Sequence, residues 1–168
     1  MSRKQKKVIL IGNFSVGKTS LIRRFVENSF SDKYISTIGM KISKKEIRIN
    51  DELLTLLIWD IEGAVNKVKR VNKTYMKGAS GVIIVSDISS LDIKEDILIH
   101  LEDFYSVNKD DVPAIIAFNK FDKNLDFKID ISDIFSKYQS LIGSFNTSAK
   151  DSLNVENMFM LLSKEMLK

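Results

Sequence analysis

The fold of this chain is decided by one octapeptide, Gly12-Asn13-Phe14-Ser15-Val16-Gly17-Lys18-Thr19, which matches the pattern G-x-x-x-x-G-K-[ST]. An apolar run at residues 8–11 precedes it, and apolar side chains at helical spacing follow it over residues 19–26. Between a strand and a helix, a glycine-rich loop can wrap its backbone N–H groups around phosphate, and the helix N-terminus also attracts the anion. A chance match anywhere in a chain of this composition has a probability of roughly 0.5%, so a phosphate-binding loop is favoured over an ordinary glycine-rich turn. In such a loop we expect Lys18 to reach the β- and γ-phosphates and the Thr19 hydroxyl to bind Mg²⁺.

Short apolar runs alternate with amphipathic stretches through the rest of the chain. Further strands are expected at residues 41–49, 53–59, 81–85, 114–118 and 142–145. Helices are expected at residues 91–105, 131–138 and 155–167. Strands alternating with helices predict an α/β fold with a mostly parallel sheet covered on both faces, and the hairpin turning at Asn50 and Asp51 adds one antiparallel edge strand. In such sheets ligands bind outside the carboxyl ends of the strands.

The composition narrows the chemistry that the chain can perform. The 168 residues include no cysteine and one histidine, His100, so disulfides, zinc–thiolate sites, cysteine nucleophiles and thioether or thioester lipids are excluded on this chain, and multi-histidine metal sites are disfavoured. No apolar run approaches the ~20 residues of a membrane-spanning helix. The net charge of +4 comes from scattered basic residues without interleaved aromatics, so no nucleic-acid partner is expected. We expect a single cytoplasmic domain over residues 1–168, without a prenylated tail, that associates with membranes only through partners or weak basic charge.

Two further motifs follow predicted strands. Asn119-Lys120-Phe121-Asp122 comes directly after residues 114–118, and Ser148-Ala149-Lys150 comes shortly after residues 142–145. Each motif alone is weak, because polar loops in a chain rich in Lys, Asn and Ser produce such tripeptides and tetrapeptides by chance. All three motifs, in order and each at the end of a strand, are not explained by coincidence.

With these motifs the chain resembles the small GTPases of the Ras superfamily, and the Rab branch in particular, over residues 7–167. The resemblance implies a Ras-like P-loop NTPase fold, a three-layer sandwich around a six-stranded sheet, with GTP or GDP and Mg²⁺ as cofactors. It implies that Asp122 accepts hydrogen bonds from the guanine N1–H and exocyclic amine, that the Ala149 N–H meets guanine O6, and that Asn119 supports the loop and meets the base edge.

The resemblance also assigns the remaining contacts to the nucleotide. The stems of Lys120 and Lys150 would pack over the guanine ring, and Phe30 matches the aromatic residue that stacks on it. The full set of nucleotide-binding positions that the resemblance implies is Asn13, Phe14, Ser15, Val16, Gly17, Lys18, Thr19, Ser20, Phe30, Tyr34, Asn119, Lys120, Asp122, Ser148, Ala149 and Lys150.

Two segments resemble the Rab switches. Residues 34–39 match switch I, with Thr37 at the position that senses γ-phosphate and Mg²⁺. Residues 59–65 stand in the place of W-D-T-A-G-Q-E, so Asp60 is expected to hold Mg²⁺ through water and the Gly63 N–H to grip the γ-phosphate. The candidate hydrolytic residues are Lys18, Thr37, Gly63 and Glu62.

Three departures from the family pattern surround the hydrolysis step. Ala64 occupies the position of the water-orienting glutamine, and alanine cannot position a water. Glu62 replaces a small residue beside the γ-phosphate, where a carboxylate would repel phosphate oxygens unless it faces away, is protonated or contacts the metal. Phe14 replaces a small residue of the phosphate loop, where its bulk would hinder water and an incoming arginine.

Three functions are consistent with this pattern. The first is a guanine-nucleotide switch with slow intrinsic hydrolysis, in which Glu62 or a partner's residue is the alternative means of orienting water. The second is a scaffold locked in one nucleotide state. The third, a P-loop kinase or ATPase, is disfavoured by Asn119–Asp122 and by the lack of an Arg-rich lid segment.

Effector and regulator proteins are expected to bind through the switches. The aromatic trio typical of Rab effector surfaces reads Ile42, Trp59 and either Thr74 or Tyr75, so its first member is lost in either register. Ordinary Rab effectors are therefore poor candidates. Trp59 is interpreted equally well as a partly buried strand residue or as a contact for a partner.

Overall fold

Six strands form one sheet in the order β2-β3-β1-β4-β5-β6 in the computed structural model, which describes residues 3–65 and 69–168. The strands are β1 (Arg3–Gly12), β2 (Met40–Ile49), β3 (Glu52–Ile61), β4 (Gly81–Asp87), β5 (Ala114–Asn119) and β6 (Leu141–Asn146). All neighbouring strands are parallel except β2 and β3, which pair from Met40↔Ile61 to Ile49↔Glu52. The predicted mostly parallel sheet with one antiparallel edge strand is therefore confirmed.

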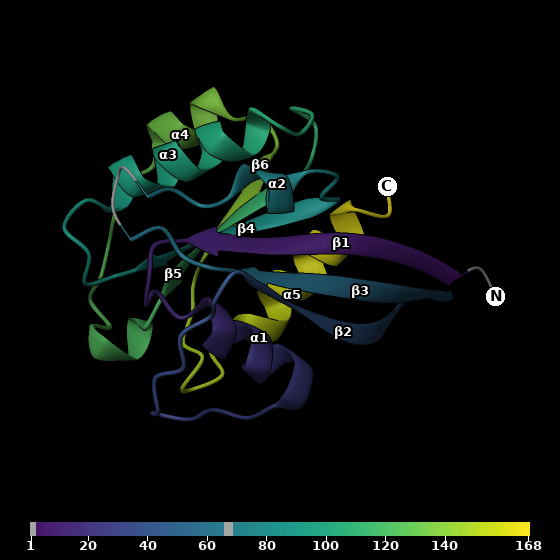
Figure 1. Cartoon of the computed structure of the whole chain (residues 1–168), viewed down its shortest axis with the longest axis horizontal. Helices are drawn as coiled ribbons and strands as arrows, with labels where there is room; N and C mark the ends of the chain where they lie inside the picture. The colour runs from purple at the N-terminus through teal and green to yellow at the C-terminus, as the bar shows by residue number, and fades with distance from the viewer. Residues whose placement is uncertain (1–2, 66–68) are drawn as a thin grey trace.

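Helices cover both faces of the sheet (Figure 1). The first face carries α1 (Lys18–Glu27) and α5 (Val155–Glu165), and the second carries α2 (Lys73–Met76), α3 (Ile93–Tyr105) and α4 (Ser132–Lys137). A 3₁₀ turn, η1 (Phe121–Lys123), follows β5. The predicted three-layer arrangement is confirmed. Within the described residues, no helix combines the length and apolar character needed to cross a bilayer.

Several boundaries differ from the sequence prediction. Strand β1 begins at Arg3 and not at residue 8, because Arg3 to Lys7 continue the parallel pairing with β3 although their side chains are charged or polar. Helix α3 begins at Ile93 and not at residue 91, since Leu91 is 99% exposed and lies outside the helix. Helix α2 and η1 were not predicted, because elements of four and three residues are too short to show periodicity.

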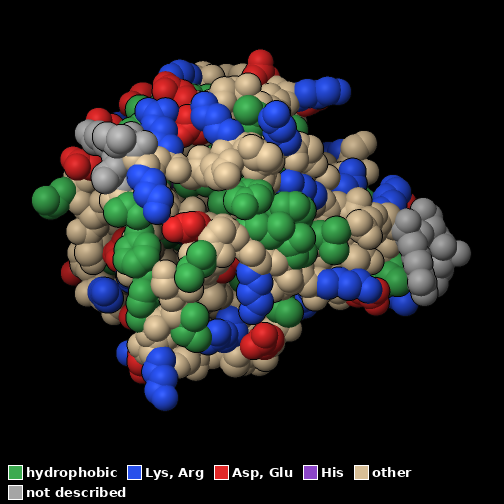
Figure 2. Space-filling view, viewed as in Figure 1, with side chains coloured by type: hydrophobic (Ala, Val, Ile, Leu, Met, Phe, Trp, Pro, Cys, Tyr) green, Lys and Arg blue, Asp and Glu red, His purple; other side chains and the backbone are tan. Residues whose placement is uncertain are grey.

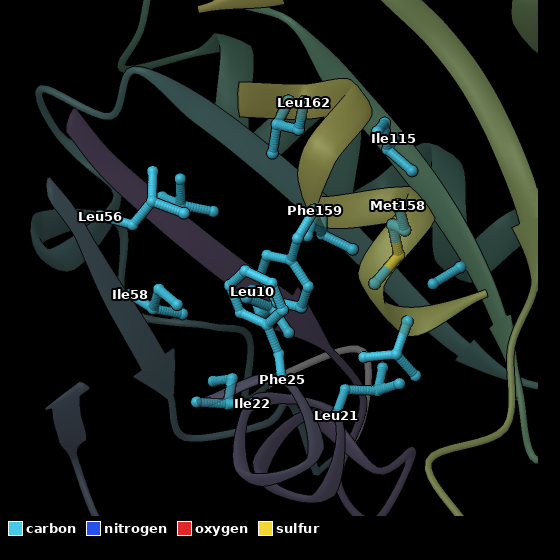
Figure 3. Close-up of a cluster of buried hydrophobic side chains, with 14 of the residues drawn as sticks. Leu10, Leu21, Ile22, Phe25, Leu56, Ile58, Ile115, Met158, Phe159 and Leu162 are labelled. Carbon is cyan, nitrogen blue, oxygen red and sulfur yellow. The ribbon is translucent and has the colours of Figure 1, made fainter. Parts of the chain in front are cut away.

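The core on the α1–α5 side centres on two aromatic rings. Phe25 of α1 and Phe159 of α5 stack with centroids 4.0 Å apart and an interplanar angle of 6°. Figure 3 shows them surrounded by aliphatic side chains from the sheet and from both helices. Strands β4 and β5 have a neighbouring strand on each side and bury side chains on both faces of the sheet, as their continuous apolar runs predicted.

The outer surface is mixed in character. Figure 2 shows hydrophobic side chains gathered across the middle of one face, with Lys, Arg, Asp and Glu side chains distributed around them. Six of the exposed large hydrophobic residues belong to the phosphate loop or lie in or beside the two predicted switches: Phe14, Tyr34, Ile35, Ile38, Ile42 and Val65.

Candidate functional site

A cavity of about 310 Å³ opens at the carboxyl ends of the strands. It lies between the phosphate loop, the segment at residues 30–37 and the loops that follow β5 and β6. Most of the residues predicted for the site line it: Phe14, Ser15, Gly17, Lys18, Thr19, Ser20, Phe30, Tyr34, Thr37, Asp60, Gly63, Asn119, Lys120, Asp122, Ala149 and Lys150. Four predicted residues do not line it: Asn13, Val16, Glu62 and Ser148.

The phosphate loop is tied to the loop after β5. Gly17 has a φ of 100°, and a side chain there would collide with the amide of Asn119. That amide donates from Nδ2 to the Val16 carbonyl oxygen at 2.9 Å and accepts on Oδ1 from the Thr147 hydroxyl at 3.2 Å. Asn119 is 1% exposed, so it acts as an internal strut between two loops of the site.

Lys18 is buried at the start of α1, with 6% of the residue exposed. Its Nζ donates to the carbonyl oxygens of Gly12 at 3.2 Å and of Asn13 at 3.0 Å. Burial lowers the pKa of Lys18 to about 8, and the Asp60 carboxylate opposes that shift. An ammonium has three N–H donors, so one is left for an anion in the cavity.

Three oxygen-bearing side chains converge beside Lys18. The hydroxyls of Thr19 and Thr37 lie 2.8 Å apart, and they donate to Asp60 Oδ2 at 2.5 Å and 3.1 Å. Asp60 is 2% exposed, and its other oxygen, Oδ1, is buried without a hydrogen-bond partner among the described residues. Hydroxyl and carboxylate oxygens are the ligands that Mg²⁺ prefers, and an orphaned carboxylate oxygen can accept from a metal-bound water. This donor set fits a Mg²⁺ ion.

The loops after β5 and β6 meet at the opposite end of the cavity. The Ser148 hydroxyl donates to Asp122 Oδ1 at 2.7 Å and so orients that carboxylate. Arg24 of α1 holds the second loop, because its Nε donates to the Ala149 carbonyl at 2.8 Å and its Nη2 to the Lys150 carbonyl at 3.0 Å. Ser148 therefore acts on the site through Asp122 although it does not line the cavity.

Lys120 links the same end of the cavity to the phosphate loop. Its backbone is left-handed, with φ of 65°, and its Nζ contacts the Ser15 carbonyl oxygen and Asp87 Oδ2, each at 2.7 Å. Burial opposes ionisation of Asp87, but the hydrogen bonds from Lys120 and Ser89 outweigh it and hold the pKa of Asp87 below its usual value. The lysine stem is thus fixed along the cavity wall.

The segment after β3 docks against the phosphate loop through its backbone. The Phe14 N–H donates to the Ala64 carbonyl at 2.8 Å, and the Ala64 N–H donates to the Gly12 carbonyl at 3.2 Å. Ala64 is 5% exposed and does not line the cavity. A Cβ on Gly63 would approach the Phe14 nitrogen to 2.7 Å, so this close docking requires glycine.

Glu62 faces switch I and not the cavity. Its Oε2 accepts from the Gly39 N–H at 3.1 Å, its own N–H donates to the Gly39 carbonyl at 2.8 Å, and its Oε1 lies 3.6 Å from Lys69 Nζ. Of the possibilities considered for this carboxylate, the geometry corresponds to a side chain that faces away from the phosphate site. Its hydrolytic role stays a prediction.

The three positions of the broken aromatic trio lie on one part of the surface. Trp59 and Tyr75 both pack, partly buried, against the core cluster on the α3 side, whereas Thr74 is exposed on α2. Ile42 is 44% exposed and pairs with Trp59 across the β2–β3 ladder. Lys7 Nζ lies 3.7 Å from the Trp59 ring centroid and donates to the Tyr75 carbonyl at 2.7 Å.

Sequence reasoning missed several residues around the site. Arg23, Asp32, Lys33 and Lys123 also line the cavity, but charged residues in loops and on helix surfaces carry no distinguishing signal. His100 of α3 reaches the phosphate loop, and the one clue was that the chain has a single histidine within an apolar helix stretch.

Comparison with known proteins shows the family to which the chain belongs. The profile of the Ras family matches residues 7–168. The chain is 33% identical to the GTP-binding protein YPTM1 of Zea mays, covering 94% of this chain and 76% of that protein. It is 35% identical to the human Ras-related protein Rab-32 over 96% of this chain and 74% of that one, and 34% identical to the Ras-related protein Rab-1C of Dictyostelium discoideum over 96% and 81%.

The phosphate loop at the end of a parallel strand defines a P-loop nucleotide-binding protein. Within that class, the chain belongs to the Ras family, and its sequence is that of a Rab-like small GTPase. Proteins of this family bind guanine nucleotide and work with effector and regulator proteins.

Proposed function

We propose that the chain is a molecular switch that binds GTP and GDP with Mg²⁺ and hydrolyses GTP slowly without help. One observation carries this proposal: the phosphate-binding and base-binding motifs line a single cavity, while Ala64, at the place of the catalytic glutamine, is buried outside it.

At the base end, Asp122 would accept the two guanine donors with its carboxylate oriented by Ser148. Adenine lacks that pair of donors, so binding it would leave a charged acceptor unmet, which is costly. Phe30, Lys120 and Lys150 line the same end and would cover the faces of the ring.

At the phosphate end, Lys18 would bind the β- and γ-phosphates with its remaining donor. Thr19, Thr37 and Asp60 would hold Mg²⁺, which neutralises phosphate charge when bound. Because Thr37 lies in the segment that would sense the γ-phosphate, loss of that phosphate would release the segment and change the surface that partners read.

Slow hydrolysis is expected because, among the described residues, no polar side chain is placed to orient a water beside the γ-phosphate. Ala64 has no polar side-chain atom and is buried, and the carboxylate of Glu62 is held by Gly39. Phe14 is 47% exposed beside the cavity, and its ring meets the edge of Tyr34 with centroids 5.5 Å apart. A water beside the γ-phosphate would therefore have no glutamine to orient it and an aromatic ring in its way.

A second function, the scaffold locked in one nucleotide state, is favoured by one set of contacts. Asn13 and Ala64 form a backbone bridge, and Gly39 and Glu62 exchange two hydrogen bonds, so the two switch segments are joined to each other and to the phosphate loop. Contacts of this kind would resist the rearrangement that a cycling switch needs.

The test is to identify the nucleotide that copurifies with the protein and then to follow a single turnover of bound GTP. The switch proposal expects GDP or GTP in the preparation, displacement by guanine but not adenine nucleotides, and slow conversion of GTP. GTP that persists unhydrolysed, with no exchange, would favour the locked scaffold. Efficient displacement by ATP would favour a kinase or ATPase, and turnover as fast as that of glutamine-bearing relatives would overturn slow hydrolysis.

A further inference from the structure

The single histidine of the chain reaches the phosphate loop from behind. His100 is 2% exposed on α3, and its Nε2 lies 2.9 Å from Asn13 Oδ1. Its Nδ1 is also buried and has no hydrogen-bond partner among the described residues. Since Oδ1 is an acceptor, the ring proton is placed on Nε2, which donates to Asn13.

We propose that His100 is a positioning residue for the phosphate site: by holding the Asn13 side chain, it fixes the part of the phosphate loop that aims Lys18. This inference rests on the proposed nucleotide-binding function. It extends that function to His100, which does not line the main cavity at the carboxyl ends of the strands and belongs to none of the sequence motifs.

Asn13 is the point where three contacts meet. Its carbonyl oxygen accepts from Lys18 Nζ at 3.0 Å, its backbone bridges to Ala64, and its side chain is held by His100. Its carbonyl also approaches to 2.8 Å the position that a Cβ on Gly63 would occupy. A shift of Asn13 would therefore move both Lys18, which would meet the phosphates, and residues 63–64 of the second switch segment.

Packing alone does not hold Asn13 in place. A second cavity of about 300 Å³ lies behind the phosphate loop and is lined by Asn13, Ser86, Asp96 and His100 among others. A side chain at the edge of a cavity has fewer close neighbours to restrain it. The hydrogen bond from His100 supplies a restraint where contacts are sparse.

Burial, more than the surrounding charges, keeps the His100 ring neutral. Burial lowers its pKa to about 4, Lys18 adds to that shift, Asp103 opposes it and Arg70 reinforces it. Asp103 is in turn paired with Arg70 at 2.9 Å and Lys73 at 3.0 Å. Asp87 and Asp96 line the same cavity as the ring. A neutral ring can donate to Asn13 without adding a second buried cation beside Lys18.

The experiment measures the release rate of fluorescent GDP from the full chain in the presence of Mg²⁺. His100→Leu removes the donor and keeps an apolar side chain, and we expect release to accelerate roughly tenfold, the cost of an unmade buried hydrogen bond. His100→Gln retains a side-chain N–H donor and should recover most of the wild-type rate. In the double variant Asn13→Ala/His100→Leu, the effect should not exceed that of the larger single change, because both remove the same bond.

Phe104→Leu is the matched control, since Phe104 is buried in the core cluster on the α3 side and lines neither of the two cavities. It should lower the thermal midpoint without changing GDP release. A folded His100→Leu protein that releases GDP at the wild-type rate, or additive effects in the double variant, would overturn this inference and leave the proposed function intact. A wild-type protein that binds no GDP would overturn the proposed function itself.

Discussion

The two ends of the main cavity are built in different ways. At the end proposed to hold guanine (the guanine end), side chains hydrogen-bond to one another, as Ser148 does to Asp122 and Thr147 to Asn119. At the end proposed to hold the γ-phosphate, the contacts around Ala64 are backbone hydrogen bonds that any residue except proline could make. The contrast teaches that recognition of a base needs particular side chains, which a sequence motif records. Docking of the second switch segment on the phosphate loop needs only backbone groups and small residues. It is therefore retained here, although Ala64 replaces the glutamine.

The largest effect is expected from a substitution that removes the proposed guanine contacts. Asp122→Ala should weaken GDP binding on the order of 1000-fold, because two hydrogen bonds to a charged group contribute about 1.5–3 kcal/mol each. Titration calorimetry with GDP measures it. Asp126→Ala, an exposed aspartate on the same loop, is the control and should bind as the wild type does. Similar affinities for the two variants would remove Asp122 from the base site.

The next-largest effect is on the pH dependence of stability. We expect His100, which contacts the phosphate loop, to make the free energy of unfolding depend on pH, and the guanine end holds no histidine. His100 has a pKa of about 4 in the folded chain against 6.5 when unfolded, so between these pH values only the unfolded chain binds the proton. The free energy of unfolding should therefore fall as pH drops from 6.5 to 4, by about 3 kcal/mol from this group. Urea unfolding of wild type and His100→Gln at pH 7 and pH 4.5 measures it.

The difference between those two proteins isolates the histidine, since carboxylates titrate equally in both. A wild-type loss of stability no greater than that of His100→Gln would show that the ring is not buried as a neutral group.

A smaller effect concerns the missing glutamine. Ala64→Gln alone should raise single-turnover hydrolysis less than about threefold, because position 64 is buried outside the cavity and Phe14 stands beside the γ-phosphate position. Phe14→Gly/Ala64→Gln should raise it further. Val65→Gln, at the exposed neighbouring position, is the control. A tenfold gain from Ala64→Gln alone would mean that the segment leaves its docked position during turnover.

The smallest effect is expected at Glu62. Glu62→Ala should change single-turnover hydrolysis less than about twofold, because its carboxylate is occupied by Gly39 and Lys69. Glu62→Gln, which can still accept from the Gly39 N–H, should match the wild type. A marked slowing in Glu62→Ala would mean that this carboxylate orients the attacking water. The γ-phosphate end would then also depend on a particular side chain, as the guanine end does.

The sheet and the guanine end could be predicted from sequence because each rests on a local pattern. Continuous apolar runs mark strands buried on both faces, and motifs at strand ends mark the loops that line the cavity. The first half of β1 was not predicted, because its residues are charged or polar and only their pairing with β3 makes them a strand. Helix α2 escaped because four residues hold no periodicity.

The rest of the site depends on contacts between distant residues that no local pattern encodes. Glu62 could face the phosphate or switch I with the same sequence, and only the position of Gly39 decides it. The contact between His100 and Asn13 joins residues 87 positions apart and has no motif. Such contacts follow from how α3 packs on the sheet.

The two links from the base loop to the phosphate loop have a consequence for binding. Asn119 holds Val16 and Lys120 holds Ser15, across 103 and 105 positions of sequence. These hydrogen bonds tie together two of the loops that line the cavity. Each immobilised side chain would otherwise cost about 0.5–1.5 kcal/mol of conformational entropy on association. Because these side chains are already held in place, little conformational entropy would be lost when a nucleotide binds, and the affinity would be correspondingly higher.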